Sequence, residues 1–350
     1  MTVIAGILSD HPLRRLCYRS CLWSLCLLAS ASTANADSAG TSAATFLQMG
    51  FGARPIGFGE AFVPVANDVS ALYYNPAGLS YPGVADEKSS AGSYQILASQ
   101  ALLTQGVSMT QVGLVNRPFG VSLTHLSLGG IEQRTLETDA PVVAGASGLA
   151  LGVSYARKVG VVGVGVTGKY IRESIASYSA TAFALDMGAL YRFESRPVSL
   201  GLDLANMGTP IRYIDQSYPL PMIVRLGAAY GLTRDFPHAL VLQLDKPYGE
   251  GVNARLDFEY RGFGPIALRA GYRTYSGTQR SAALGKSLGS TASSMADFYG
   301  MTLGAGLRTP YGDLDYALVP SDELGTAHRM SYSFNFGGKK AATSNTGAAK

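Results

Sequence analysis

Apolar and charged residues alternate along several segments in the C-terminal half of the chain. From Ala254 to Arg261 every even position is apolar and every odd position is charged. Only a β-strand with two unlike faces satisfies a two-residue period, because a helix would spread these charges around its circumference. The same period is present in residues 222–230, 240–245, 266–273, 301–308, 313–318 and 329–336.

The alternating segments predict an all-β fold, a transmembrane antiparallel β-barrel with an N-terminal hatch segment. We count about fourteen strands of about ten residues, the length that crosses a bilayer at the tilt of a barrel strand. Tight turns are expected near residues 116–119, 194–197, 233–237, 262–265 and 309–312, and longer connections at 135–145, 208–221, 275–297 and 319–326. Short turns that alternate with long loops are typical of bacterial outer-membrane barrels.

A secreted soluble β-sandwich is the alternative, because its strands also alternate between apolar and polar residues. Three features favour the barrel: the strand length, the two classes of connection, and the aromatic residues at strand ends. These aromatic residues are Tyr230, Phe263, Tyr272, Tyr275, Phe298 and Tyr299.

The N-terminus has the order of a cleavable signal peptide. Arg14, Arg15 and Arg19 precede an apolar stretch at residues 22–31, and the small residues Ala34-Asn35-Ala36 follow it. The apolar stretch is about half as long as the roughly twenty residues that a membrane-spanning helix needs. We therefore predict Sec-type export, cleavage after Ala36 and localisation in the outer membrane.

The composition of the predicted mature chain excludes several classes of site. All three cysteines lie in the leader, at positions 17, 21 and 26, so neither a disulfide framework nor a thiolate metal site is expected. Residues 37–350 carry 25 Lys and Arg against 23 Asp and Glu, without a long basic run, which argues against a nucleic-acid partner. His238 and His328 lack a second ligand at metal spacing. We expect no metal and no cofactor.

Two apparent enzyme motifs have simpler interpretations. Residues 163–168 match a glycine-rich dinucleotide pattern, but the following residues 169–172 are strand-like, and glycines that relieve crowding in a barrel wall explain the match better. His125 and Ser127 share one face of a strand and resemble the hydrolytic pair of outer-membrane phospholipases. No companion Asn follows at a suitable position, and acyl transfer also needs an oxyanion site. We predict no catalytic residues.

If the apolar positions of the barrel strands face lipid, the polar positions face the lumen. The lumen charges singled out are Arg225, Arg255, Asp257, Arg269 and Arg329. Because both signs are interleaved on neighbouring strands, we expect a structural network of ion pairs. The alternative, a field that selects ions of one sign, would need an excess of one charge.

The segment between the leader and the first strand has the composition of a compact, irregular element. Residues 50–59 alternate glycine with Phe, Arg, Pro and Ile, which permits a non-repeating path. Asn75, Pro76, Ala77 and Gly78 predict a turn, in which Pro fixes φ, Asn caps the turn and Gly takes a positive φ. Phe46, Phe51, Phe58 and Phe62 form either an apolar pocket for a ligand or the small core of this segment.

Two parts of the chain resemble the PorV/PorQ family of outer-membrane proteins, which is related to FadL-type channels. The first is the run from Phe58 to Asp68 with its continuation from Ala71 to Leu79, and the second is 314–320 with Leu324-Gly325 and His328-Arg329. The resemblance implies an N-terminal hatch folded into the barrel lumen. The predicted organisation is a signal peptide at 1–36, a hatch or plug at 37–85, a transmembrane barrel at 86–336 and a disordered tail at 337–350.

The resemblance also implies two alternative functions for a non-enzymatic barrel. PorV/PorQ proteins imply export or surface attachment of proteins through a type IX-like secretion system. The FadL relationship implies passive transport of hydrophobic small molecules such as long-chain fatty acids. The expected partners are outer-membrane lipid and either secretion-system proteins or hydrophobic small molecules.

Overall fold

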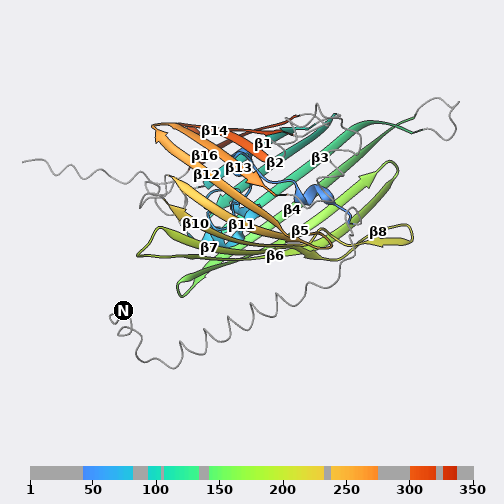
Figure 1. Cartoon of the computed structure of the whole chain (residues 1–350). Coiled ribbons are helices and arrows are strands. Elements are labelled where there is room, and N and C mark those ends of the chain that lie inside the picture. Colours follow the sequence, from blue (N-terminus) through green and yellow to red (C-terminus); the bar gives the residue numbers. More distant parts are fainter. Residues whose placement is uncertain are drawn as a thin grey trace, which may run out of the picture. The chain divides into compact units, whose positions relative to one another are not determined.

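A computed structural model describes residues 42–81, 94–103, 106–133, 142–231, 238–274, 300–320 and 326–336. Fourteen antiparallel strands close into a barrel, in which each strand pairs with its neighbours along the chain and β1 pairs with β16. A separate two-stranded sheet, β8 with β9, lies in the connection between β7 and β10. The predicted barrel of about fourteen strands is confirmed (Figure 1).

The strands have the following bounds. In the first half they are β1 Tyr94–Leu102, β2 Val107–Asn116, β3 Phe119–Gln133, β4 Val142–Val159, β5 Val162–Ile175, β6 Tyr178–Arg192, β7 Val198–Gly208, β8 Ile211–Tyr213 and β9 Gln216–Tyr218. In the second half they are β10 Ile223–Gly231, β11 Ala239–Pro247, β12 Asn253–Phe263, β13 Ile266–Arg273, β14 Met301–Thr309, β15 Gly312–Pro320 and β16 Thr326–Phe336.

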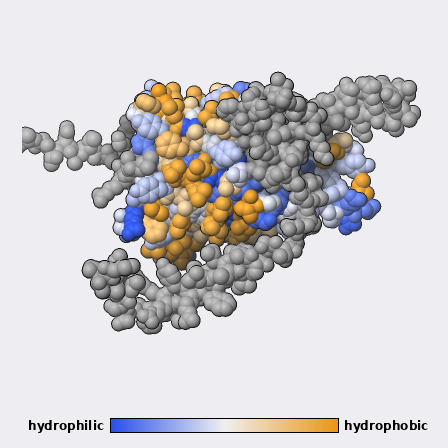
Figure 2. All heavy atoms as spheres, in the orientation of Figure 1, coloured by the Kyte–Doolittle hydropathy of each residue, from blue (hydrophilic) through white to orange (hydrophobic). Residues whose placement is uncertain are grey.

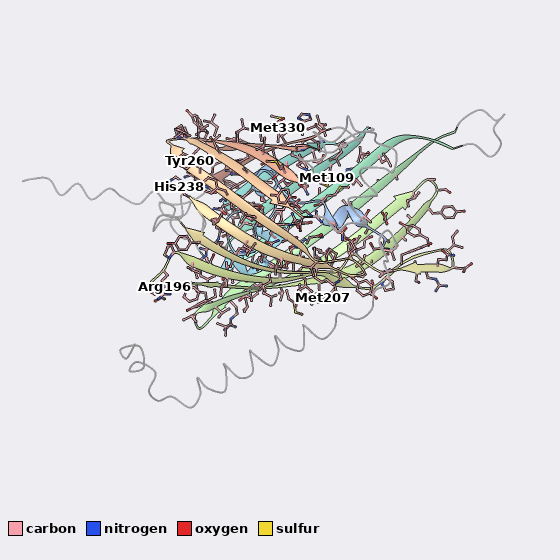
Figure 3. All side chains as sticks on the ribbon, viewed as in Figure 1. Met109, Arg196, Met207, His238, Tyr260 and Met330 are labelled. Atoms are coloured by element: carbon pink, nitrogen blue, oxygen red, sulfur yellow. The ribbon has the colours of Figure 1, made fainter. Side chains whose placement is uncertain are left out.

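Side chains of the barrel strands alternate between an apolar outer face and the lumen. In β11, Leu242 and Leu244 are 53% and 44% exposed, whereas Val241 and Gln243 are buried. Figure 3 shows the same contrast for Met330, which projects away from the barrel, and the buried Met109. The apolar outer residues form the orange surface of the barrel in Figure 2. This is the face that a bilayer requires, as the two-residue period predicted.

Strand lengths differ from the expectation on one side of the barrel. Strands β10 to β16 have 8 to 11 residues, close to the predicted ten. Strands β3 to β6 have 15, 18, 14 and 15 residues, so the predicted length is too short for them. Pairing explains the extension: the β4–β5 ladder runs from Val159–Val162 to Ala146–Ile175, which satisfies the backbone groups of both strands beyond the bilayer length.

The two ends of the barrel carry different connections. We call one the short-turn end, where tight turns join Asn116 to Phe119, Val159 to Val162 and Thr309 to Gly312. The opposite, long-loop end carries the connections between β3 and β4, β7 and β10, and β13 and β14. Tyr94 at the start of β1 pairs with Phe336 at the end of β16, so both termini of the barrel lie at the short-turn end.

Residues 42–81, here called the hatch segment, run through the lumen from one end to the other. At the long-loop end, the Ala43 N–H donates to the Pro219 carbonyl, 3.0 Å away. At the short-turn end, the Tyr81 hydroxyl donates to the Leu190 carbonyl at 2.9 Å. The short helical elements between them are η1 Thr45–Gln48, α2 Ala53–Gly57, α3 Ala71–Tyr74 and η2 Pro76–Ser80. Within the described part of the chain, no helix has the length and apolar character needed to cross a membrane.

Several predictions concern residues outside the described ranges. They are the leader with its cleavage after Ala36, the outer limits of the hatch at 37 and 85, the turn at 233–237, the whole loop at 275–297, and the tail at 337–350.

Candidate functional site

The candidate site is the contact between the hatch segment and the inner wall of the barrel. At its short-turn end, Asn75 is fully buried and its side chain makes three hydrogen bonds. Its side-chain oxygen accepts from the Ala77 N–H at 3.1 Å, and its amide donates to the Val63 carbonyl at 3.1 Å and to the Ala189 carbonyl of β6 at 3.0 Å. Asn75 therefore caps the η2 turn and ties the hatch to the wall in one residue.

The other residues of the predicted turn are in η2. Pro76 begins this helix and Ala77 is buried beside it. Gly78 does not have the positive φ that the turn prediction gave it. Its lack of a side chain is needed for packing, because a Cβ at this position would overlap the carbonyl oxygen of Ala66.

Glycines of the facing barrel wall leave the space that the η2 turn occupies. A Cβ at Gly163 would lie 2.6 Å from the ring of Tyr81, and one at Gly165 would lie 2.6 Å from the Pro76 carbonyl oxygen. On β6, a Cβ at Gly188 would lie 2.9 Å from Pro76. The glycine-rich pattern at 163–168 is thus part of the barrel wall, and its glycines let the hatch backbone approach closely.

The four hatch phenylalanines are buried in two separate clusters. Phe51, Phe58 and Phe62 belong to one cluster, where Phe62 packs edge-on against Tyr74 with ring centroids 5.5 Å apart. Phe46 packs in the other, with Ile171, Ile211 and Leu220 among its members. A cavity of about 20 Å³ lies beside Phe46 and Phe51, with room for about one water molecule.

On the wall opposite these glycines, ion pairs link neighbouring strands. Arg225 contacts Asp203 at 2.9 Å, and the two residues are directly opposite each other on β10 and β7. Arg269 bridges Glu259 at 2.6 Å and Asp315 at 2.7 Å. Because these side chains are buried, each charge needs such a partner to offset the loss of water.

Three further lumen charges contact the hatch. Arg255 pairs with Asp245 of the adjacent strand and with Glu60 of the hatch. Asp257 accepts a hydrogen bond from the Ala61 N–H at 2.6 Å. Arg329 donates to the Gly50 carbonyl at 2.8 Å.

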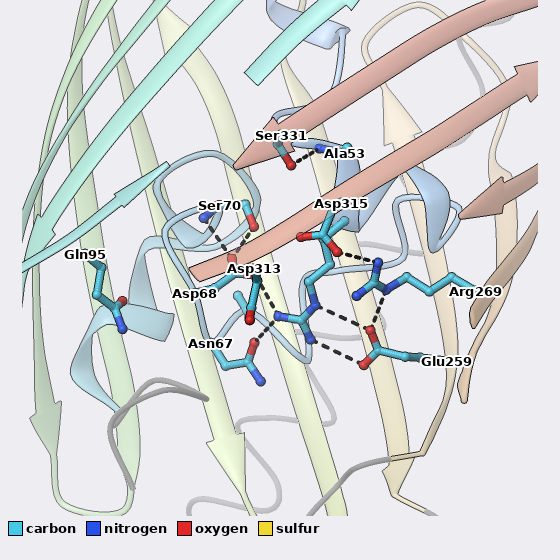
Figure 4. A network of polar contacts seen from close by, with 12 residues as sticks. Ala53, Asn67, Asp68, Ser70, Gln95, Glu259, Arg269, Asp313, Asp315 and Ser331 are labelled. Carbon is cyan, nitrogen blue, oxygen red and sulfur yellow. Dashed lines mark hydrogen bonds and ion pairs between the residues drawn. The ribbon is translucent and has the colours of Figure 1, made fainter. Parts of the chain in front are cut away.

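The hatch contributes its own arginine to this network (Figure 4). Arg54 contacts Asp68 at 2.6 Å and Glu259 at 3.4 Å, and its guanidinium lies 5.1 Å from the centroid of the Phe62 ring. Glu259 therefore forms ion pairs with three arginines, Arg54, Arg261 and Arg269. Arg54 and Glu60 were not among the site residues predicted from the sequence. One signal could have found them: they are the only charged residues between positions 42 and 66.

The largest cavity whose lining we describe, about 250 Å³, lies at the long-loop end between the hatch and strands β12 to β16. Glu60, Arg255, Arg273 and Arg329 are the charged residues of its lining. A smaller cavity of about 70 Å³ also contacts Glu60, Arg255 and Arg273.

The histidines do not assemble into a catalytic or metal site within the described ranges. His125 lies on the outer face of β3, His238 stacks on Tyr260 at the barrel rim (Figure 3), and His328 contacts the Tyr316 hydroxyl at 2.7 Å. The structure as described contains no group of three or more His, Cys, Asp or Glu residues that could hold a metal ion.

Comparison with protein families assigns the chain. The model of the family "Type IX secretion system protein PorV" matches residues 32–245, more than half of the sequence. The chain belongs to the PorV family. A comparison with curated proteins found no match.

Solved structures of outer-membrane proteins share the fold of this PorV-family chain. The Pseudomonas putida toluene transporter TodX aligns with a TM-score of 0.52 and 10% identity, over 82% of this chain and 96% of TodX. A deltaS2 mutant of the TodX monoaromatic hydrocarbon channel gives a TM-score of 0.50 and 11% identity, over 81% and 96% of the two chains. The barrel, its family and these neighbours make the protein an outer-membrane β-barrel related in fold to FadL-type channels.

Proposed function

We propose that this chain is a non-enzymatic component of a type IX-like secretion system that acts in the export or surface attachment of proteins. Its membership of the PorV family supports this role. The structural observation that carries the proposal is the occupation of the lumen by the hatch segment. Side chains of several strands accept hydrogen bonds from its backbone, among them Ser331 from Ala53, Asp257 from Ala61, and Gln243 from Val63.

A hatch held in this way opposes passage of solutes through the barrel. Its displacement would break the ion pairs Arg54–Glu259 and Glu60–Arg255, each of which is partly or fully buried. Separating buried charges costs several kcal/mol for each ion left without a partner. The long-loop end, which faces outward in bacterial outer-membrane barrels, therefore serves in this proposal as a docking face for protein partners.

The alternative is a passive channel for hydrophobic small molecules such as long-chain fatty acids. The fold shared with the toluene transporter TodX and the cluster of Phe51, Phe58 and Phe62 in the hatch favour it. This function would require the hatch to move and its aromatic core to open, because an acyl chain needs an apolar pocket of several hundred Å³.

Paired variants in a deletion strain of the native host test the two functions. We expect a shortened 275–297 loop to release surface-attached proteins into the medium, while uptake of a labelled long-chain fatty acid is unchanged. Under the channel alternative, Phe58→Ser with Phe62→Ser would impair that uptake and leave the surface proteins attached. Each variant is first checked for assembly by its anomalous migration in cold SDS. If correctly assembled variants alter neither readout, both functions are wrong.

The role of the hatch as a plug is tested separately. Irregular backbone at membrane depth is tolerated only when it is buried in protein or lines a water-filled cavity. We expect a variant lacking residues 42–81 to assemble and to conduct far more current in planar bilayers than the complete barrel. Unchanged conductance would contradict the plug.

The proposed maturation has its own readout. We propose that the leader is removed after Ala36, so the mass of the protein purified from outer membranes should correspond to a chain beginning at Asp37. A mass that retains residues 1–36 would contradict this cleavage.

A further inference from the structure

Arg329 differs from the other buried arginines of the lumen. Arg225, Arg255 and Arg269 each form an ion pair with a carboxylate of a neighbouring strand. Arg329 is only 6% exposed, yet among the described residues it donates a hydrogen bond to the Gly50 carbonyl and makes no ion pair with a carboxylate. The carboxylate that acts on its charge is that of Glu60, which is already paired with Arg255, so Arg329 shares this partner and has no carboxylate of its own.

The strands beside Arg329 place no carboxylate opposite it. Its register partners are Ala101 on β1 and Ala317 on β15, both of which have side chains too short and apolar to pair with it. The next lumen carboxylate along β15, Asp315, is already bound by Arg269 at 2.7 Å. The hatch carboxylate of Glu60 forms its ion pair with Arg255.

Arg329 lies in the wall of the 250 Å³ cavity at the long-loop end. Two more arginines, Arg255 and Arg273, line the same cavity, and Glu60 is the one carboxylate among the lining residues that we describe. The Thr302 hydroxyl is buried in this wall and has no hydrogen-bond partner within the described ranges. The described lining thus combines the Arg329 guanidinium, which has no carboxylate of its own, with an unused hydroxyl donor.

The cavity lies at the long-loop end of the barrel. Its lining includes Leu103, Met301, Pro320 and Ala327, which lie at or beside the ends of four strands. Its volume exceeds by several-fold the roughly 30 Å³ that one water occupies in the liquid. It therefore has room for an anionic group and part of the molecule that carries it.

We propose that this cavity binds the anionic group, a carboxylate or a phosphate, of a ligand that enters from the long-loop end, with Arg329 as the principal contact and Thr302 as a hydrogen-bond donor. Guanidinium groups match both anions, because their parallel N–H groups can bind two oxygens at once. The site is independent of the proposed function, since either a secretion component or a channel could use it.

Calorimetric titration of the complete barrel folded in detergent tests the site, with acetate and inorganic phosphate as probes at constant ionic strength. We expect at least one probe to bind with a Kd on the order of 1 mM, a weak but measurable affinity for a small anion. Arg329→Gln should weaken binding about tenfold or more, and Thr302→Val a few-fold. Arg308→Gln is the control, because it removes the same charge from an exposed residue at the short-turn end and should change binding less than about twofold.

The comparison of probes identifies the ligand chemistry. Binding of acetate alone indicates a carboxylate, and binding of phosphate indicates a phosphate. If phosphate binds, the affinity of a short-chain phosphatidic acid is measured next. Tighter binding than that of free phosphate indicates a lipid headgroup, and equal or weaker binding indicates a soluble phosphate. If Arg329→Gln fails to assemble, the same titrations are made with the Arg329→Lys and Thr302→Val variants. Absence of binding by the unmodified barrel, or equal binding by its assembled Arg329→Gln or Thr302→Val variant, overturns the proposal.

Discussion

The two sides of the barrel wall hold the hatch segment in different ways. On the side formed by β2 to β6, the lumen positions that meet the hatch include Gly113, Gly148, Gly163, Gly165 and Gly188, which admit Val69, Phe46, Tyr81 and the η2 turn. On the side formed by β10 to β16, glycines such as Gly271 and Gly304 also meet the hatch backbone, but charged residues stand beside them. Arg255, Asp257 and Glu259 bond to polar groups of the hatch.

The comparison distinguishes two ways of holding a plug in a barrel: close packing of its backbone against glycines, and ion pairs with the wall. At a glycine wall the hatch backbone packs so closely that an added side-chain atom would overlap it. An ion-pair wall is held by interactions that weaken when one partner is neutralised, and whose removal leaves the other charge buried. We therefore expect the glycine side to be sensitive to added volume and the charged side to the loss of a charge.

The largest effect should come from Glu259→Gln on the charged side. This change leaves Arg54, Arg261 and Arg269 without their shared carboxylate. Removing one partner of a buried ion pair costs about 3–5 kcal/mol. We expect the free energy of unfolding, measured by circular dichroism in a urea titration of the detergent-folded barrel, to fall by this amount.

Asp313→Asn is the matched control for Glu259→Gln. It removes one carboxylate from an exposed pair with Arg308, which should contribute about 0–1 kcal/mol. Equal losses in the two variants would show that burial of the lumen network has no energetic consequence.

Asn75→Ala should have the next largest effect, on the glycine side. The variant leaves the Val63 and Ala189 carbonyls and the Ala77 N–H without their buried partner. An unsatisfied buried polar group costs about 1–3 kcal/mol, and losses within one cluster are not additive, so we expect roughly 3 kcal/mol in total. The same urea titration measures it, and a loss below that of Asp313→Asn would contradict the role of Asn75 as an anchor.

Gly165→Ala tests the shape of the glycine wall directly. Its Cβ would lie 2.6 Å from the Pro76 carbonyl oxygen, so the η2 turn must move. Overpacking of this kind costs about 1–3 kcal/mol. The control is Gly168→Ala on the same strand, where a Cβ meets no atom within 4 Å, and where we expect a change within about 0.5 kcal/mol. If both variants unfold at the same urea concentration, the wall does not constrain the hatch.

The smallest effect is expected for Phe58→Leu in the hatch core between the two walls. The variant keeps an apolar side chain but loses the edge-on contact with Phe62, whose ring centroid is 6.3 Å away. Such aromatic pairs contribute about 0.5–1.5 kcal/mol beyond the area that they bury. A loss as large as that of Glu259→Gln, in the same titration, would mean that the aromatic core rather than the ion pairs holds the hatch.

The sequence by itself determined the barrel, because strand periodicity and tight turns are local properties of the chain. The alternation predicted one strand with its observed limits, Ile266–Arg273, and placed β10, β11, β12 and β14 to β16 within a few residues of theirs. It underestimated β3 to β6 and missed the β8–β9 sheet. These features depend on which neighbour a segment can pair with, and the pattern of a single strand does not contain that information.

Only the tertiary structure decided which partner each charge in the lumen receives. Arg255 meets Glu60, 195 positions earlier in the chain, because the barrel closes around the path of the hatch. The same closure brings Arg54 to Glu259 and places two alanines beside Arg329. Alternation could predict that these arginines face the lumen. Their pairing depends on the register between strands and on the route of an irregular segment, which are set by packing and hydrogen bonds across the closed barrel.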